Sequence, residues 1–219
     1  MKSPCRVFGW LVLAGLTSVI LVAPALAVNP IVVFNSFGPG NTYNNAIVWG
    51  VTGASTSGGY RGQAEFFVPT ASGVLSSITL PTFRQSGSGR SNFFVAQDNG
   101  SAPGTILESF LSTVNNPSGL LTLNSAVQPL LTAGVKYWLC DEPADATTVN
   151  GWFEGQSYAP GFAFERSQWS WNVVAPPSVP PSGVFSVSVI SVPEPMALLL
   201  TPLAGLFVCR FKHATNRRG

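Results

Sequence analysis

Four glutamates in the central part of the chain are the side chains that could act as general acids or bases: Glu65, Glu108, Glu154 and Glu165. A glycoside hydrolase needs two carboxyl groups roughly 5 to 10 Å apart across a cleft, one to protonate the leaving oxygen and one to act as base or nucleophile. The sequence does not show which of these glutamates converge. Most surface carboxylates only keep a protein soluble, so we expect no catalytic residue and a protein that is not an enzyme.

Histidine and cysteine are too scarce for the usual nucleophilic or metal chemistry. The single histidine, His213, stands in the basic C-terminal segment, which removes Ser-His-Asp and Cys-His catalysis and the common zinc and copper sites. Of the three cysteines, only Cys140 lies outside the two apolar ends, so no disulfide can form within the central part. Its apolar surroundings in "KYWLC" predict a buried, inert thiol, and we expect neither metal nor cofactor.

One short acidic segment could offer oxygen ligands. "CDEPAD" brings Asp141, Glu142 and Asp145 together in a predicted turn, and a hard cation such as calcium accepts carboxylate oxygens. The segment lacks the acidic spacing and central glycine of an EF-hand loop. We expect a solvated acidic turn, with calcium binding as the alternative.

Tryptophans form the other candidate site. "SQWSW" places Trp169 and Trp171 two residues apart, on one side of a strand, and Trp152 lies close by in the sequence. Exposed together, they would stack on the apolar faces of sugar rings; buried, they would belong to the core. Large aromatic side chains are more often buried, so we expect the core role and keep carbohydrate stacking as the alternative.

The charge distribution gives no support for nucleic-acid binding. The formal net charge is +2, but the positive residues gather at the two ends, and residues 28–191 are mildly acidic. Nucleic-acid binding requires lysines and arginines clustered on one face.

Residues 28–191 predict one all-β domain. Short segments rich in Val, Ile, Phe, Trp and Thr alternate with clusters of Gly, Pro, Asn and Ser, and none shows a capped helical period. In "GVFSVSVI", Phe185, Val187 and Val189 share one face, and "GVKYWLC" does the same with Val135, Tyr137 and Leu139. So many strands must close on each other to bury their edges, and we expect a jelly-roll-like β-sandwich. The predicted strands cover residues 31–35, 45–49, 63–68, 74–80, 92–97, 105–111, 120–124, 135–140, 148–153, 162–165, 169–174 and 184–190.

The first 27 residues predict a secretory signal peptide. A positive start precedes an apolar run, and Ala25-Leu26-Ala27 supplies the small residues that signal peptidase recognises. We expect an exported chain that begins at Val28 after cleavage; a retained N-terminal anchor is the alternative.

The middle of the chain resembles the β-sandwich modules called choice-of-anchor domains. The similarity rests on "FFVAQDNGSAPGTILESF", in which a strand leads into a turn that closes with Pro-Gly, on "LTAGVKYWLCDEPADATTVNGWF" and on "SQWSW". It covers roughly residues 63–190. Such domains occur on surface proteins with various C-terminal anchors, so the resemblance implies a location rather than an activity.

The tail, residues 192–219, resembles a PEP-CTERM sorting signal. Pro193, Glu194 and Pro195 precede an apolar segment and a basic end that contains Arg210, Lys212, Arg217 and Arg218. The resemblance implies processing by an exosortase, an integral membrane protease of bacteria that make extracellular polysaccharide. The interrupted basic cluster and Thr201-Pro202 within the apolar segment depart from the family pattern.

The length of the apolar segment agrees with a transient membrane stay. As a helix, residues 196–209 would extend about 21 Å at about 1.5 Å per residue, less than the ~30 Å hydrocarbon core. The basic end would stay on the cytoplasmic side. A permanent single-pass anchor is the alternative.

These features together predict a non-catalytic exported protein of the cell surface or extracellular matrix, transiently anchored in the inner membrane and associated with extracellular polysaccharide. Signal peptidase and an exosortase-type protease are the expected partners. The alternative is a secreted polysaccharide-active enzyme or carbohydrate-binding module with the same sorting tail.

Overall fold

The computed structural model describes residues 29–100, 102–114, 118–155, 163–167, 170–173 and 183–192. The predicted signal helix and the predicted hydrophobic sorting helix both lie outside these ranges. Within them the one helical element is a short 3-10 turn, η1 (Pro39–Asn41). No helix among the described residues is both long and apolar enough to cross a membrane.

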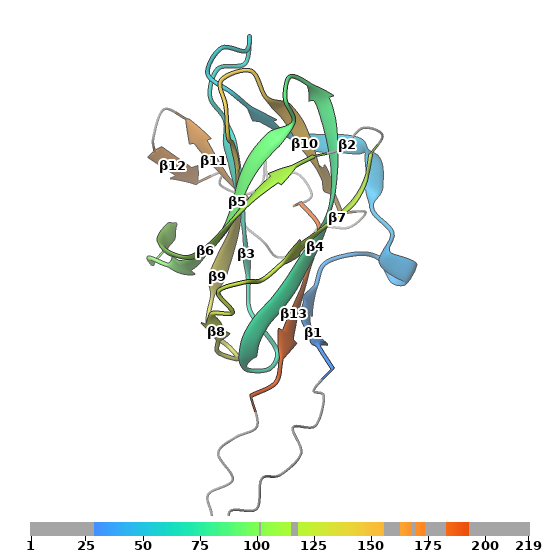
Figure 1. Ribbon diagram of the computed structural model, residues 1–219, viewed down its shortest axis with the longest axis vertical. Coiled ribbons are helices and arrows are strands. Elements are labelled where there is room, and N and C mark those ends of the chain that lie inside the picture. The colour runs from blue at the N-terminus through green and yellow to red at the C-terminus, as the bar shows by residue number, and fades with distance from the viewer. Residues whose placement is uncertain are drawn as a thin grey trace, which may run out of the picture.

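The described part is all-β, as predicted, and consists of two sheets in which every strand pair is antiparallel (Figure 1). The larger sheet has seven strands: β1 (Ile31–Asn35), β2 (Asn44–Thr52), β4 (Gly73–Ser86), β7 (Gly119–Asn124), β8 (Leu130–Leu131), β10 (Val149–Glu154) and β13 (Ser186–Ile190). The smaller has six: β3 (Gly62–Phe67), β5 (Arg90–Asp98), β6 (Pro103–Thr113), β9 (Tyr137–Pro143), β11 (Ala163–Ser167) and β12 (Ser170–Val173). All twelve predicted segments overlap observed strands; the two-residue β8 was not predicted.

The long strand β4 organises the larger sheet. It pairs with β13 along its first part and with β10 along its second, at Ile78↔Val187 and Thr82↔Trp152. Its other edge pairs with β7 and β8. Because β1 extends the β13 side and β2 extends the β10 side, one strand connects both halves of the sheet.

The first and last strands are neighbours. Ile31 of β1 lies opposite Val189 of β13. Since the pair is antiparallel, the chain enters the domain beside the point where it leaves, at the lower end of the view in Figure 1.

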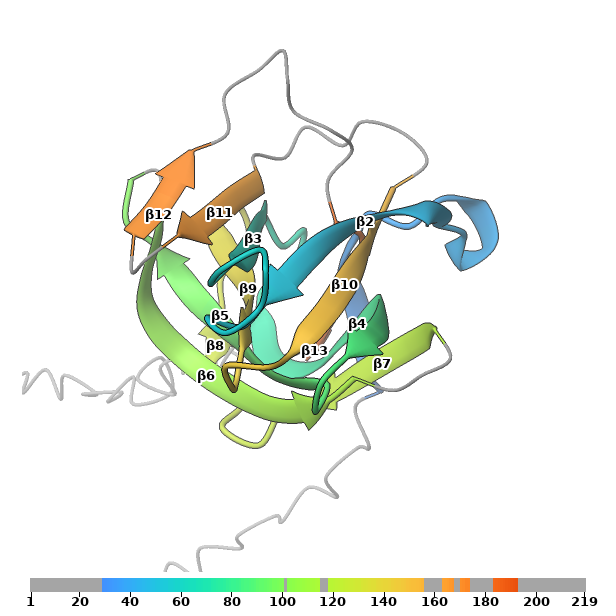
Figure 2. The ribbon, with the colours of Figure 1, turned by 90° about the horizontal axis from the view of Figure 1, so that it is seen from above.

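The smaller sheet is strongly curled, in the order β12-β11-β3-β9-β5-β6 (Figure 2). Three strands separate β12 from β5, yet the rings of Trp171 and Phe94 are 6.5 Å apart between centroids. The curl therefore closes a second, smaller apolar cluster on the outer face, which contains Phe94, Trp138 and Cys140.

The main core lies between the two sheets and follows the predicted alternation in part. Phe185, Val187 and Val189 all belong to it, as predicted. In "GVKYWLC", Tyr137 and Leu139 also belong to it, but Val135 precedes β9 and is 44% exposed, so its placement in that buried row was wrong. Val135 is exposed because the strand begins only at Tyr137; within β9 both faces are buried, one against each cluster.

Candidate functional site

The interior of the domain is polar at one end. In β3, Gln63 and Glu65 share a face with the core residue Phe67, because alternate residues of a strand point the same way. The same alternation in β9 directs Asp141 inward, beyond Leu139, and in β10 it directs Asn150 inward, beyond Trp152. These polar side chains are as thoroughly buried as their apolar neighbours.

Two amide side chains at this end are fixed by their donors. Gln63 Nε2 donates to the carbonyl of Gly50 at 2.8 Å. Asn150 Nδ2 donates to the carbonyl of Gly89 at 3.1 Å and to Ser91 Oγ at 2.9 Å. Each amide therefore has a set orientation. Its nitrogen donates to a backbone carbonyl, and its oxygen has no hydrogen-bond partner among the described residues.

Four oxygens here have no hydrogen-bond partner within the described part of the chain: Gln63 Oε1, Asn150 Oδ1 and both carboxyl oxygens of Asp141. At the other end of β10, Glu154 Oε2 also has none. All are acceptors in their usual ionisation state. A buried polar atom without a partner costs roughly 1 to 3 kcal/mol, so this end of the interior requires a balancing donor or cation.

Burial raises the pKa of Asp141 well above its usual range, and the nearby Glu142 raises it further. The Ser91 hydroxyl lies close enough to lower the pKa of Asp141, although it does not reach hydrogen-bonding geometry with either carboxyl oxygen. The neutral acid is therefore favoured when nothing positive lies beside it.

Two of the four glutamates considered as acids or bases converge. Glu65 accepts a hydrogen bond from the Gly183 N–H at 3.0 Å, and burial, with a smaller contribution from Glu154, raises its pKa to about 8. Burial also raises the pKa of Glu154, against a hydrogen bond from Trp49. The two side chains are only 3% and 2% exposed, so they form an interior pair and not the walls of an open cleft.

Glu108 does not join that pair. Its carboxylate accepts hydrogen bonds from the hydroxyl of Ser125 at 2.5 Å and from the backbone N–H groups of Ala126 and Val127 at 2.7 and 3.0 Å. It thus binds the segment between β7 and β8 to β6 of the other sheet. The side chain of Glu165 is outside the described residues.

The acidic segment "CDEPAD" is not one turn, which corrects the sequence-based interpretation. Asp141 and Glu142 both lie in β9, on opposite faces, because the strand continues to Pro143. Asp145 lies in the following loop, where hydrogen bonds, above all from Ser88, hold its pKa at about 2. No three His, Cys, Asp or Glu side chains in the described ranges are grouped to hold a metal ion.

The tryptophans considered for carbohydrate stacking do not form one surface. Trp152 is fully buried and donates its Nε1–H to the Val184 carbonyl at 2.9 Å, so a stacking role for it was wrong and its core role is confirmed. Trp171 is half-buried against the second cluster. Trp169 lies outside the described residues.

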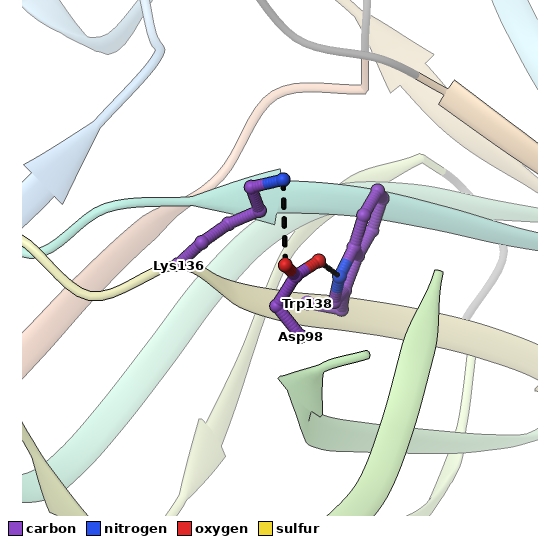
Figure 3. Close-up of polar contacts among 3 residues, drawn as sticks. All are labelled: Asp98, Lys136 and Trp138. Carbon is purple, nitrogen blue, oxygen red and sulfur yellow. Dashed lines mark hydrogen bonds and ion pairs between the residues drawn. The ribbon is translucent and has the colours of Figure 1, made fainter. Parts of the chain in front are cut away.

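A polar contact group stands on the outer face of the smaller sheet (Figure 3). Asp98, at the end of β5, accepts a hydrogen bond from Trp138 Nε1 at 2.7 Å and pairs with Lys136 Nζ at 3.5 Å. The Lys136 ammonium also lies 5.3 Å from the centroid of the Phe66 ring. An ammonium over an aromatic face is attracted by the ring quadrupole, so both contacts fix the lysine.

Two adjoining hollows flank Asp98. The larger, about 440 Å³, is lined by Gln97, Asp98, Asn99, Gly104 and Thr105. The smaller, about 300 Å³, is lined by Gln97, Asp98, Val135, Lys136 and Tyr137. Amide, carboxylate, hydroxyl and ammonium groups therefore converge there, which suits a ligand rich in hydroxyl groups.

Sequence reasoning named Glu65, Glu154 and Asp141 but not their amide neighbours Gln63 and Asn150, and it missed the group around Asp98. Strict alternation places Gln63 and Asp141 on the faces that also carry Phe67 and Leu139. The turn "DNGSAPG" and the strand "KYWLC" supply Asp98, Lys136 and Trp138, but only strand pairing shows that β5 and β9 are neighbours.

Ala25 and Ala27, the sorting motif Pro193 to Pro195 and the basic tail all lie outside the described residues. Comparisons of the chain with protein-family models, with curated proteins and with solved structures found no match.

Proposed function

We propose that this is a non-catalytic exported protein of the cell surface or extracellular matrix, delivered by a signal peptide and sorted by a PEP-CTERM-like tail. The observation that carries the proposal is the pairing of β1 with β13. Since the chain enters and leaves the domain at one end, both proposed sorting segments attach there. A domain attached in this way presents its sides and its opposite end outward, as a displayed module must.

The proposed processing takes place at both ends of the chain. Signal peptidase removes residues 1–27, and an exosortase-type membrane protease acts at Pro193 to Pro195 while the apolar segment stays in the inner membrane. The mature chain then ends near Pro193 to Pro195, and its residues 28–191 form a single domain with a jelly-roll-like arrangement of the two sheets. The helices proposed for the two ends are thus present only before processing.

We further propose that the domain contacts extracellular polysaccharide at the hollows beside Asp98. Gln97 and Asn99 are exposed there, and Asp98 and Lys136 are already held in place by Trp138 and Phe66. Polar groups that are fixed before binding lose little side-chain entropy when they meet sugar hydroxyls.

The alternative, a polysaccharide-active enzyme, has one observation in its favour: Glu65 and Glu154 lie close enough to interact electrostatically, and the pKa of Glu65 is raised as a general acid requires. Their burial weighs against it, since a scissile bond would have to reach both groups.

Intact-mass measurement on protein recovered from the native envelope or medium tests the sorting proposal. We expect a chain that starts at Val28 and ends near Pro193 to Pro195. Recovery of a chain that still carries Arg217 and Arg218 would show a permanent anchor instead.

Retention of the purified protein on extracellular polysaccharide from the organism that makes it tests the contact surface beside Asp98. We expect a Gln97→Ala/Asn99→Ala variant to lose retention while its melting temperature stays unchanged. The matched control is Gln85→Ala/Asn124→Ala, which removes the same two exposed side-chain types from the other sheet. Release of reducing sugar by the wild type, abolished in Glu65→Gln, would establish the enzyme alternative.

A further inference from the structure

Three strands direct acceptor oxygens into one part of the interior, between the two sheets. β9 contributes both carboxyl oxygens of Asp141, β3 contributes Gln63 Oε1 and β10 contributes Asn150 Oδ1. The side chains are 0%, 3% and 2% exposed, and none of these four oxygens has a hydrogen-bond partner in the ranges that the structure describes.

Strand register makes the three side chains neighbours. Gln63 and Asp141 are directly opposite each other in the β3–β9 pair and point the same way, a relationship that puts Cβ atoms roughly 4.5 to 5.5 Å apart. Asn150 approaches from the other sheet and is connected to them through Ser91 Oγ, 2.9 Å from its Nδ2. Ser91 stands on β5, which pairs with β9 on the side away from β3.

Backbone carbonyls of neighbouring strands and turns fix the orientations of the Gln63 and Asn150 amides. Gly50 and Gly89 offer carbonyl oxygens, which only an N–H can meet, so the Gln63 and Asn150 nitrogens must face them. Both amide oxygens are consequently left without a donor: Gln63 Oε1 on the residue directly opposite Asp141, and Asn150 Oδ1 on a side chain joined to the same region through Ser91. Buried acceptors without donors require a positive charge or added donors.

We propose that Asp141, Gln63 and Asn150 form an internal site for a hard cation of the calcium or sodium type. Carboxylate and amide oxygens are the ligands that such ions prefer, and neither sulfur nor imidazole is part of the group. With one carboxylate and two neutral oxygens, the site differs from clusters of three or more His, Cys, Asp or Glu, of which the described ranges hold none. The inference departs from the metal-free domain expected from the sequence, and it does not depend on the proposed function.

Thermal unfolding of the full chain in a mild detergent tests the site. The protein is stripped with a chelator and moved into choline chloride, and calcium chloride or sodium chloride then replaces choline at constant ionic strength and fixed pH. We expect one of the two ions to raise the melting temperature in a saturable way, by roughly 5 to 10 °C at about a hundred times its dissociation constant. Which ion does so identifies the occupant.

Asp141→Asn should abolish this rise, whereas Glu142→Gln should keep it. The control removes a neighbouring carboxylate of the same strand that points to the opposite face. If Asp141→Asn does not fold, equilibrium dialysis of the wild type against the same two salts still decides, with about one bound ion per chain expected.

Two results would overturn the proposal. One is a wild type that melts at the same temperature in choline, sodium and calcium salts and binds neither ion on dialysis. The other is an Asp141→Asn variant whose melting temperature in choline chloride exceeds that of the wild type, when added sodium or calcium changes the melting temperature of neither protein. In either case Asp141 is held as a neutral acid that donates to an amide oxygen.

Discussion

Glu65 and Glu154 come together inside the domain, from strands of different sheets, closely enough for Glu154 to raise the pKa of Glu65. Burial is the larger cause, and with both effects the pKa of Glu65 moves from 4.5 to about 8. The folded protein thus holds a proton that the unfolded chain releases at neutral pH, and this difference links folding to pH.

Stability should therefore fall as the pH rises from about 4.5 to about 8. The folded state binds more protons than the unfolded state throughout this window, so the free energy of unfolding decreases by up to about 1.4 kcal/mol per pH unit. Denaturant unfolding at several pH values, in choline chloride with a chelator, measures the slope. Glu65→Gln should make the slope less steep, leaving the share that the raised pKa values of Asp141 and Glu154 contribute, and Glu142→Gln should change it less. Equal slopes for the wild type and Glu65→Gln would contradict the assignment.

Removing the Glu108 carboxylate should release the segment that follows β7. Glu108→Ala leaves the Ala126 and Val127 N–H groups without their acceptor, and we expect a loss of roughly 1 to 3 kcal/mol in the free energy of unfolding. Hydrogen exchange at these two amides should accelerate. Glu108→Gln, which keeps one acceptor oxygen, is the control and should lose less; an unchanged exchange rate in Glu108→Ala would refute the contact.

Trp152 and Trp171 should differ sharply when each is replaced by alanine. Trp152→Ala opens a cavity in the main core and should cost roughly 3 to 5 kcal/mol. Trp171→Ala removes a half-buried ring from the second cluster and should cost clearly less. Urea unfolding compares the two, and similar losses would mean that the curled edge of the smaller sheet is as tightly packed as the core.

Cys140 should behave as an inert packing residue. It is fully buried in the second cluster, so iodoacetamide should modify the native protein far more slowly than the urea-unfolded protein. Cys140→Ala should cost on the order of 1 kcal/mol. Alkylation of the native protein at the rate of the unfolded chain would show that the outer cluster opens readily.

The strands could be predicted from the sequence, but the side chains that different strands bring into contact could not. Alternation in "GVFSVSVI" and the glycine- and proline-rich turns predict β13 and most other strands within a few residues. Asp141 was misplaced because a local view of "CDEPAD" suggests a turn, whereas pairing with β3 and β5 extends β9 through it. The meeting of Glu65 with Glu154 depends on two sheets facing each other, which no local pattern encodes.

The place of β13 in its sheet has a mechanical consequence. This strand is bonded on both sides, to β1 and to β4, and it is the last strand before the chain continues beyond Ser191. Tension transmitted along the chain from that end would act parallel to β13 and load the hydrogen bonds of both flanking ladders at once. When the opposing force acts at the far end of the sheet, this load shears both ladders together, which resists rupture better than peeling an edge strand away bond by bond.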